Sequence, residues 1–211
     1  FFPKGTAVLS HGPGINSTYY LNETMKEVTD HETAFTYKVS FRTQAVLTAW
    51  AAENYVKLLS PFDPTNSGLD SLATGTEHRW KSWGFDFVSK PQSVFTYMLS
   101  ARHGGYYQNG RRVNIAADIG YRFQPYVSFL LSAAYNDIDL PHPWNNRRFW
   151  LIGPRLDVTM TNKLYFTAFA QYNEQTRNVN LNTRLQWRYR PASDLFIVHT
   201  DNYFPETSSV R

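Results

Sequence analysis

The stretch Val179–Arg190, VNLNTRLQWRYR, decides the fold class, because apolar and polar side chains alternate along it. Its odd positions are apolar except for Thr183. Its even positions are all polar: Asn180, Asn182, Arg184, Gln186, Arg188 and Arg190. Successive side chains of a β-strand point to opposite faces, so this period of two predicts a strand with one apolar and one polar face. A helix of the same sequence would mix both kinds of residue on every face.

The same period recurs along the chain and predicts an all-β fold with about 10–12 antiparallel strands. Clear alternation is found in four more segments: Thr33–Arg42, Val113–Phe123, Val127–Tyr135 and Leu164–Tyr172. Further strands are expected at Gly14–Met25, Glu77–Val88, Ser93–Tyr106, Arg147–Met160 and Leu195–Tyr203. The segment Gln44–Leu59 fits either a strand or a short helix.

The expected connections alternate between short and long, which is typical of an up-and-down antiparallel meander. Short turns are expected at Arg42–Gln44, Ser89–Gln92, Gln124–Pro125, Thr161–Lys163 and Pro191–Ser193. Longer or more polar links are expected at Lys26–Glu32, Leu58–Thr74, Asp137–Asn146 and Asn173–Arg177. Asn109-Gly110 predicts a tight type I′ hairpin. We therefore expect residues 1–211 to form a single β-barrel segment that is incomplete at both ends.

Composition excludes several classes of protein. The chain has no Cys, which removes disulfide scaffolds, thiolate metal sites and Cys nucleophiles. Its 21 Lys and Arg exceed its 17 Asp and Glu only slightly, and no run of basic residues exceeds two, so a nucleic-acid partner is not expected. The longest apolar runs have four residues, whereas a membrane-spanning helix needs roughly 20.

Two features favour a transmembrane barrel over a soluble β-sheet. The expected strands run to about ten residues, which matches a membrane-spanning strand better than the usual soluble strand. Aromatic residues gather where the segments end, as they do at the two interfaces of a bilayer. The aromatic girdle is expected to comprise Phe41, Phe87, Phe123, Tyr126, Tyr165 and Tyr189 near the short turns, and Tyr106, Tyr135, Trp150 and Tyr172 near the longer links. The alternative is that aromatic residues favour strands in every setting.

Charges in the middle of strands supply a third argument. Each charge would cost roughly 2–4 kcal/mol at the midplane of a bilayer, so it must face a lumen or water. The polar lumen lining is expected to comprise Asp118, Arg122, Asn180, Asn182, Arg184, Gln186, Arg188 and Arg190. This basic lining could attract anions or an acidic plug domain. Alternatively, the arginines pair with Asp118, Asp157 and Asp201 and fill a narrow lumen.

Motifs that carry catalysis or bind cofactors are weak. Ser100 and His103 could suggest a barrel lipid hydrolase, but at this spacing they do not share a face of a strand. His142, with Asp137 and Asp139 nearby, matches no metal-ligand spacing. We expect no catalytic residue, no metal and no cofactor. The loop Leu58–Thr74 is either a partner-binding loop or a solvated one.

The segment Asn182–Val198, NTRLQWRYRPASDLFIV, resembles the last part of a family of Gram-negative outer-membrane proteins. In that family, a domain similar to carbohydrate-binding module family 9 precedes a C-terminal β-barrel. The stretch LSHGPGIN at Leu9–Asn16 is compatible with the resemblance, which would cover most of this chain as the distal half of the barrel. The sugar-module-like domain and the final strand with its terminal aromatic residue are absent, which fits a fragment.

The sequence therefore leads to one functional hypothesis and one main alternative. The chain is expected to be a non-catalytic, porin-like β-barrel in the bacterial outer membrane, acting as a scaffold, a pore or a subunit of a complex. Its partners would be the lipid bilayer and other outer-membrane or periplasmic subunits. The alternative is a soluble extracellular β-sandwich that binds carbohydrate through exposed Trp and Tyr side chains.

Overall fold

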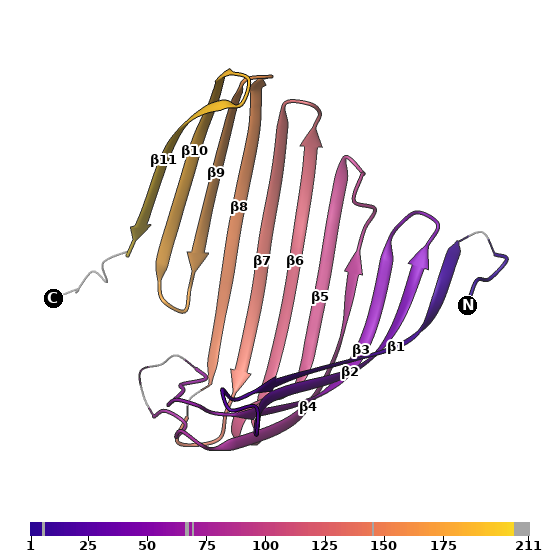
Figure 1. Cartoon of the computed structure of the whole chain (residues 1–211), viewed down its shortest axis with the longest axis vertical. Helices are drawn as coiled ribbons and strands as arrows, with labels where there is room; N and C mark the ends of the chain where they lie inside the picture. Colours follow the sequence, from indigo (N-terminus) through magenta and orange to yellow (C-terminus); the bar gives the residue numbers. More distant parts are fainter. Residues whose placement is uncertain (6, 66–67, 69, 145, 205–211) are drawn as a thin grey trace. The chain divides into compact units, whose positions relative to one another are not determined.

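The fold is all-β, and its strands form one antiparallel sheet in chain order. The computed structural model describes residues 1–204 apart from 6, 66–67, 69 and 145. Within these residues each of eleven strands is hydrogen-bonded to the next, from β1 to β11, in the up-and-down order of a meander (Figure 1). This confirms the predicted fold class and strand number. The order does not return to its first strand, so the described part of the sheet is open.

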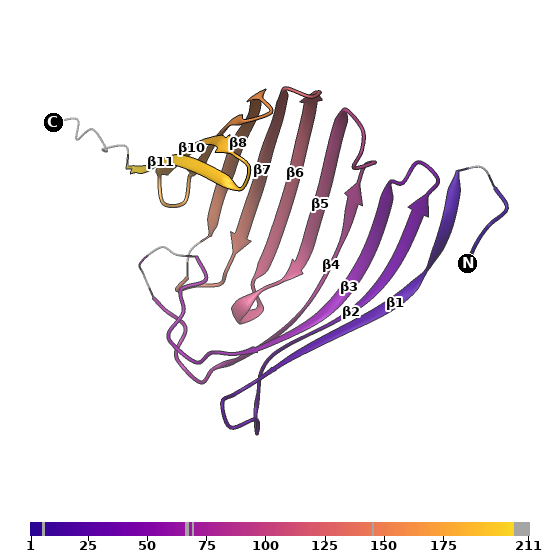
Figure 2. The same ribbon diagram turned by 45° about the horizontal axis from the view of Figure 1, so that its top comes forward.

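The strands are long, between 10 residues in β9 and 15 in β8. Their bounds are β1 (Val8–Leu21), β2 (Val28–Phe41), β3 (Val46–Lys57), β4 (Glu77–Val88), β5 (Phe95–Gly105), β6 (Arg111–Phe123), β7 (Val127–Asp139), β8 (Arg147–Thr161), β9 (Leu164–Asn173), β10 (Asn178–Arg190) and β11 (Ser193–Tyr203). One short 3₁₀ turn, η1 (Tyr107–Asn109), joins β5 to β6 (Figure 2). The predicted lengths and the short turns are confirmed.

Several segments differ from those predicted. The segment that fitted either a strand or a helix is strand β3. Strand β2 begins at Val28, within the link expected at Lys26–Glu32. Strand β1 spans Val8–Leu21 rather than the expected Gly14–Met25, so it includes Gly12-Pro13-Gly14, and Pro13 lies opposite Tyr37. A proline is tolerated there because β1 is the end strand of the described sheet, so its missing N–H breaks no ladder on the outer side.

The hairpin between β5 and β6 lies one residue earlier than predicted. Gln108 and Asn109, with φ of 54° and 58°, occupy the left-handed region that a type I′ turn requires, and the Gly110 N–H donates to the Tyr107 carbonyl at 2.9 Å. Gly110 itself has a φ of −71°. A Cβ on Gly110 would lie 2.3 Å from Leu140 Cδ2, so close packing explains this glycine better than its backbone conformation does.

The chain divides into two compact units, which are described separately. Unit 1 comprises Phe1–Pro91, Met98–Ile115 and Tyr135–Arg148. Unit 2 comprises Gln92–Tyr97, Ala116–Ala134 and Phe149–Arg211, and is described as far as residue 204.

The long link between β3 and β4 in unit 1 makes ordered contacts, although most of its described residues are exposed. Phe62 and Leu72 exchange two backbone hydrogen bonds, of 3.0 and 2.7 Å, and form an isolated bridge. Leu72 and Thr65 are each 1% exposed. The Phe62 ring lies 5.2 Å from the Tyr107 ring in the hairpin between β5 and β6. Residues 66, 67 and 69 of this link lie outside the described part of the chain.

Candidate functional site

The register of β2–β5 sorts the side chains of unit 1 onto two unlike faces of the sheet. One row of residues directly opposite one another is polar: Lys38, Thr48, Asp86 and Ser100. The next row, one residue along each strand, is apolar: Tyr37, Ala49, Phe85 and Ala101. We call these the polar face and the apolar face, and each is continuous over these strands because side chains alternate.

The polar face of unit 1 is held together by Arg102. Its guanidinium Nη2 donates to Ser82 Oγ at 3.1 Å, to Glu32 Oε2 at 3.3 Å and to Asn54 Oδ1 at 3.4 Å. The same guanidinium lies 5.1 Å from the centre of the Trp50 ring. Asn54 and Ser82 are only 6% and 4% exposed, so Arg102 satisfies polar groups that are shielded from water.

Asp86 forms the second centre of this face. Its carboxylate accepts the Trp50 Nε1–H at 2.9 Å and the Ser100 hydroxyl at 2.7 Å. Because Trp50 contacts both Arg102 and Asp86, the hydrogen bonds of four strands, β2 to β5, form one connected polar network. Such a network orients its members, and removing any one of them destabilises the protein more than the loss of an isolated hydrogen bond would.

A second arginine, Arg112 on β6, lies on the same side of unit 1. It donates to Asn136 Oδ1 at 3.1 Å, and Asn114 donates to the same oxygen at 3.0 Å. Its guanidinium lies 5.4 Å from the Tyr106 ring centre, and its buried Nε has no partner within the described residues. Arg112 and Arg102 both line a small hollow of about 60 Å³. This hollow could hold a water molecule or a small anion, but it is too small to be a pore.

An aromatic cluster covers the polar side of unit 1 next to the longer links. The Tyr107 ring has its centre 4.8 Å from Tyr106, 5.0 Å from Trp80 and 5.1 Å from His78. Burial raises the pKa of the Tyr107 phenol to about 12, because the ionised form would lose its hydration. Tyr106 was predicted to belong to the outer girdle, but its contact with Trp80 places it in this cluster instead.

Unit 2 repeats the two-faced arrangement. In β8, β9 and β10 the polar row includes three residues that lie directly opposite one another: Asp157, Thr167 and Arg184. The adjacent apolar row extends to β11: Val158, Phe166, Leu185 and Ile197. Asn180, Asn182 and Gln186 share the face of Arg184, as their spacing on β10 predicts.

Part of the charge on the unit 2 polar face is paired. Asp157 accepts two hydrogen bonds from Arg155, of 2.8 and 3.1 Å, and one of 2.9 Å from Thr167. Arg188 donates to Asp194 at 3.1 and 3.4 Å across the β10–β11 hairpin. Of the three aspartates expected in the ladder of Arg–Asp pairs, Asp157 forms an ion pair, whereas Arg122 and Arg184 form none with the described residues.

The remaining predicted polar residues differ in their placement. Arg122 lines a hollow of about 140 Å³ together with Asp157, and Asp118 is half-buried on the same strand face as Arg122. Arg190 lies opposite Ser193, after an irregularity in the register. Asp201 was expected to join the ladder of Arg–Asp pairs, and that expectation is wrong: it lies opposite Leu181, on the apolar face.

Strand β11 departs from the two-faced pattern. Phe196 and Val198 lie opposite Gln186 and Arg184 on the polar face, while Ile197 lies on the apolar face. Phe196, Ile197 and Val198 are 50%, 60% and 56% exposed. An end strand that exposes apolar side chains on both faces is a surface on which further chain can pack.

The predicted aromatic girdle lies mostly on the apolar face. Seven of its residues have side chains on the same face as the apolar stripe of their strand: Phe41, Phe87, Phe123, Tyr135, Trp150, Tyr172 and Tyr189. Tyr126 lies in the β6–β7 turn and is 63% exposed. Tyr165 lies opposite Thr159 and Gln186 on the polar face, where its hydroxyl donates to the Asn162 carbonyl at 2.7 Å. Tyr106 and Tyr165 therefore do not share the face of these seven residues.

The apolar face is largely uncovered by other parts of the described chain. Ile15, Phe35, Ile119 and Trp187 are 65%, 64%, 46% and 49% exposed. The buried hydrophobic side chains among the described residues are few: Ala34, Ala52, Tyr55, Leu58, Leu72, Ile138, Leu140 and Phe149.

The geometry offers little for catalysis or metal binding at the positions considered. Ser100 donates to Asp86 on the polar face, whereas His103 lies opposite Trp83 on the apolar face, so the two cannot form a nucleophile–base pair. Within the described residues, no three His, Asp or Glu side chains are grouped to hold a metal ion. None of the helical segments described has the length and apolar character needed to cross a membrane.

Arg102 and Arg112 were missed by sequence reasoning. Both lie at even positions in segments where alternation is interrupted by small residues, such as Gly104-Gly105. The signal available in the sequence was spacing: Arg102 is two residues from Ser100, and Arg112 is two residues from Asn114, so each arginine lies on the same strand face as that polar residue.

Comparison with known proteins gives no relative to reason from. No protein-family model, no curated protein and no solved structure matches this chain.

Proposed function

We propose that this chain is a segment of a transmembrane β-barrel of the bacterial outer membrane, in which the apolar face meets lipid and the polar face lines an enclosed wet interior. In that setting it acts as a non-catalytic scaffold, pore or subunit of a membrane complex. The resemblance of Asn182–Val198 to the outer-membrane family with a sugar-module-like domain belongs to the same proposal.

The observation that carries the proposal is the contrast between the two faces. Along β10, Leu185 and Trp187 lie on the apolar face, where Trp187 is 49% exposed, while Arg184 and Gln186 lie on the polar face. In a bilayer the cost of exposing the apolar side chains to water disappears. Strands of 10 to 15 residues are long enough to cross its hydrocarbon core.

Pairing of the charges favours a scaffold or subunit over a wide charged pore. Arg155 with Asp157, Arg188 with Asp194, and Arg102 with Glu32 each neutralise charge on the polar face. A small barrel lumen is filled by side chains that pair in this way.

The alternative is a soluble β-sandwich that binds carbohydrate. Exposed aromatic side chains such as Trp83 and Trp187, which are 59% and 49% exposed, could stack on sugar rings. A sandwich also needs a second sheet to cover the apolar face, and the described strands all belong to one sheet.

Extraction and electrophoresis test the proposal. We expect the natural full-length protein to stay with the membrane fraction until detergent is added. We also expect it to migrate differently in SDS with and without heating, because a closed barrel resists SDS until it is heated. Full solubility in plain buffer, together with binding to insoluble polysaccharide, would replace the proposal with the alternative.

A further inference from the structure

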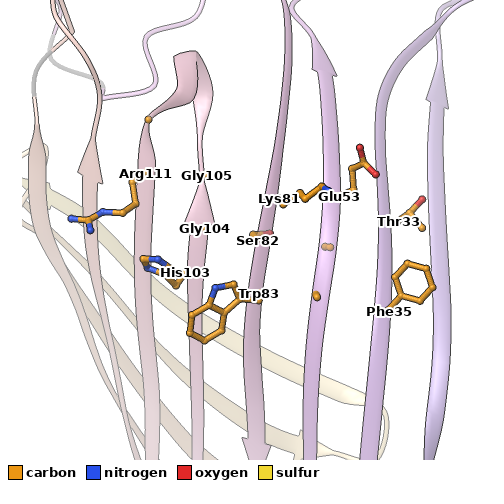
Figure 3. Close-up of a pocket in the computed structure, with 13 residues that line it drawn as sticks. Thr33, Phe35, Glu53, Lys81, Ser82, Trp83, His103, Gly104, Gly105 and Arg111 are labelled. Carbon is orange, nitrogen blue, oxygen red and sulfur yellow. The ribbon is translucent and has the colours of Figure 1, made fainter.

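A groove of about 600 Å³ lies on the apolar face of unit 1, over β2 to β6. Small residues, including Ala51, Gly104 and Gly105, line it and form what we call its floor. The rings of Phe35 and Trp83 lie beside it (Figure 3). Phe35 and Trp83 are 64% and 59% exposed. The small residues of the floor leave a depression between larger neighbours, which makes a concave apolar surface where the rest of the face bears bulky side chains.

The groove lies where the polarity of this face changes. Towards the short turns, two successive rows are apolar except for the hydroxyl of Tyr37: first Tyr37, Ala49, Phe85 and Ala101, then Val39, Leu47, Phe87 and Leu99. Towards the longer links, the next row is polar and charged: Thr33, Glu53 and Lys81. The row between them contains Trp83 opposite Ala51. Tryptophan favours the boundary between hydrocarbon and head groups.

Charged side chains form one rim of the groove. In Figure 3, Lys81, Arg111 and Glu53 all lie on the side of Trp83 and Phe35 that faces the longer links. All three are exposed. Two cations against one carboxylate leave a net positive charge next to an apolar floor. A molecule with an acyl chain and an anionic head group matches both parts.

We propose that this groove is a binding site for an anionic phospholipid, whose acyl chain lies on the floor of small residues and whose phosphate meets the rim of Lys81 and Arg111. The inference rests on the proposed function, since it places the groove at the level of the lipid head groups. Glu53 weakens the site because it lies directly opposite Lys81 in the sheet.

Lipid selectivity tests the site. The purified full chain would be equilibrated in detergent with phosphatidylglycerol or phosphatidylcholine of the same acyl chains, and bound lipid counted by native mass spectrometry. We expect preferential binding of phosphatidylglycerol. Each of Lys81→Gln and Arg111→Gln should reduce that preference about fivefold, and Glu53→Gln should increase it about as much. Equal binding of the two lipids, or a preference unmoved by these variants, would overturn the site.

The floor is tested with a matched pair of variants. Ala51→Leu should fill the groove and reduce binding of phosphatidylglycerol, whereas Ala49→Leu, one row away and also exposed, should not. Equal effects of the two would show that no groove is involved. Soluble glycerophosphoglycerol that competes as well as the lipid would show that only the phosphate is recognised, which also contradicts the site.

A second measurement does not depend on variants at the floor. In bilayers that contain brominated phosphatidylglycerol, Trp83 should be quenched more than in bilayers with brominated phosphatidylcholine, and Trp83→Phe should remove the difference. A chain that enters the bilayer without this difference overturns the lipid site and leaves the proposed function standing. A chain that does not enter the bilayer overturns both.

Discussion

At the scale of single residues, Arg102 does more than any other side chain to organise the polar face of unit 1. It brings Glu32, Asn54 and Ser82, from three different strands, to one guanidinium. The Arg102–Glu32 pair is partly exposed, so its charge attraction contributes little alone. The larger effect comes from Asn54 and Ser82, whose polar groups are shielded from water and would lose a partner.

Arg102→Met should therefore destabilise the protein by about 1–3 kcal/mol, because the shielded Asn54 Oδ1 loses its donor and Ser82 Oγ keeps only the hydrogen bond from the Asn54 amide. Denaturant unfolding in detergent, followed by tryptophan fluorescence, measures the change. Lys90→Met, at an exposed turn, is the control and should change stability little. Equal stabilities of the two variants would show that the hydrogen bonds of Arg102 do not stabilise the protein.

Ionisation of Tyr107 makes the stability of the fold depend on pH in the alkaline range. Burial raises its pKa to about 12, while an unfolded tyrosine ionises near pH 10. Between these values the unfolded chain loses the proton and the folded chain keeps it, so stability falls as pH rises from about 10 to about 12. Tyr107→Phe should flatten that fall, whereas Tyr126→Phe, in an exposed turn, should not. Titration of phenolate absorbance provides the direct check, and an unchanged high-pH step in Tyr107→Phe would contradict it.

At the scale of strands and turns, alternation predicted most of the fold. The strand bounds at β4 and β10 and all five short turns could be read from the period of two and from turn residues. Alternation did not distinguish a strand from a helix at β3, because all four residues of Ala49–Ala52 are apolar although their side chains point alternately to the two faces. It also could not show that the polar faces of β3, β4 and β5 converge on Arg102, since the register between strands also depends on the geometry of the turns.

The hairpin between β5 and β6 shows a limit of turn motifs. Asn109-Gly110 predicted the type of turn but not its position, because the packing of Gly110 against Leu140 is invisible in local sequence. Gly110→Ala should destabilise the protein by about 1–3 kcal/mol through overpacking. Adding Leu140→Ala should recover part of the loss if steric contact is the cause. If the double variant loses as much stability as the two single variants lose together, this explanation is contradicted.

The faces of β10 can be tested with a neighbouring pair of residues. Leu185 lies opposite Phe166 and Ile197 on the apolar face, and Gln186 lies on the polar face. Leu185→Arg should reduce the stability of the protein refolded in bilayers by about 2–4 kcal/mol, since it places a charge in lipid. Gln186→Arg should have a much smaller effect. Two variants of equal stability would mean that the two faces meet the same solvent.

At the scale of the whole molecule, the sheet satisfies its backbone between neighbouring strands but leaves its apolar face uncovered in the described residues. The sequence predicted that Asn180, Asn182, Arg184 and Gln186 share one face of β10, opposite to Leu181, Leu185 and Trp187. It did not predict the groove next to Trp83, because the floor depends on how small residues from neighbouring strands align.

The central claim is that the apolar face lies in lipid and the polar face in water. The chain contains no Cys, so single cysteines can be placed at each position from Leu181 to Trp187 in turn and labelled with a water-soluble maleimide in intact membranes. The account predicts labelling at Asn182, Arg184 and Gln186 and protection at Leu181, Thr183, Leu185 and Trp187. Uniform labelling, or labelling at the odd positions alone, would contradict it.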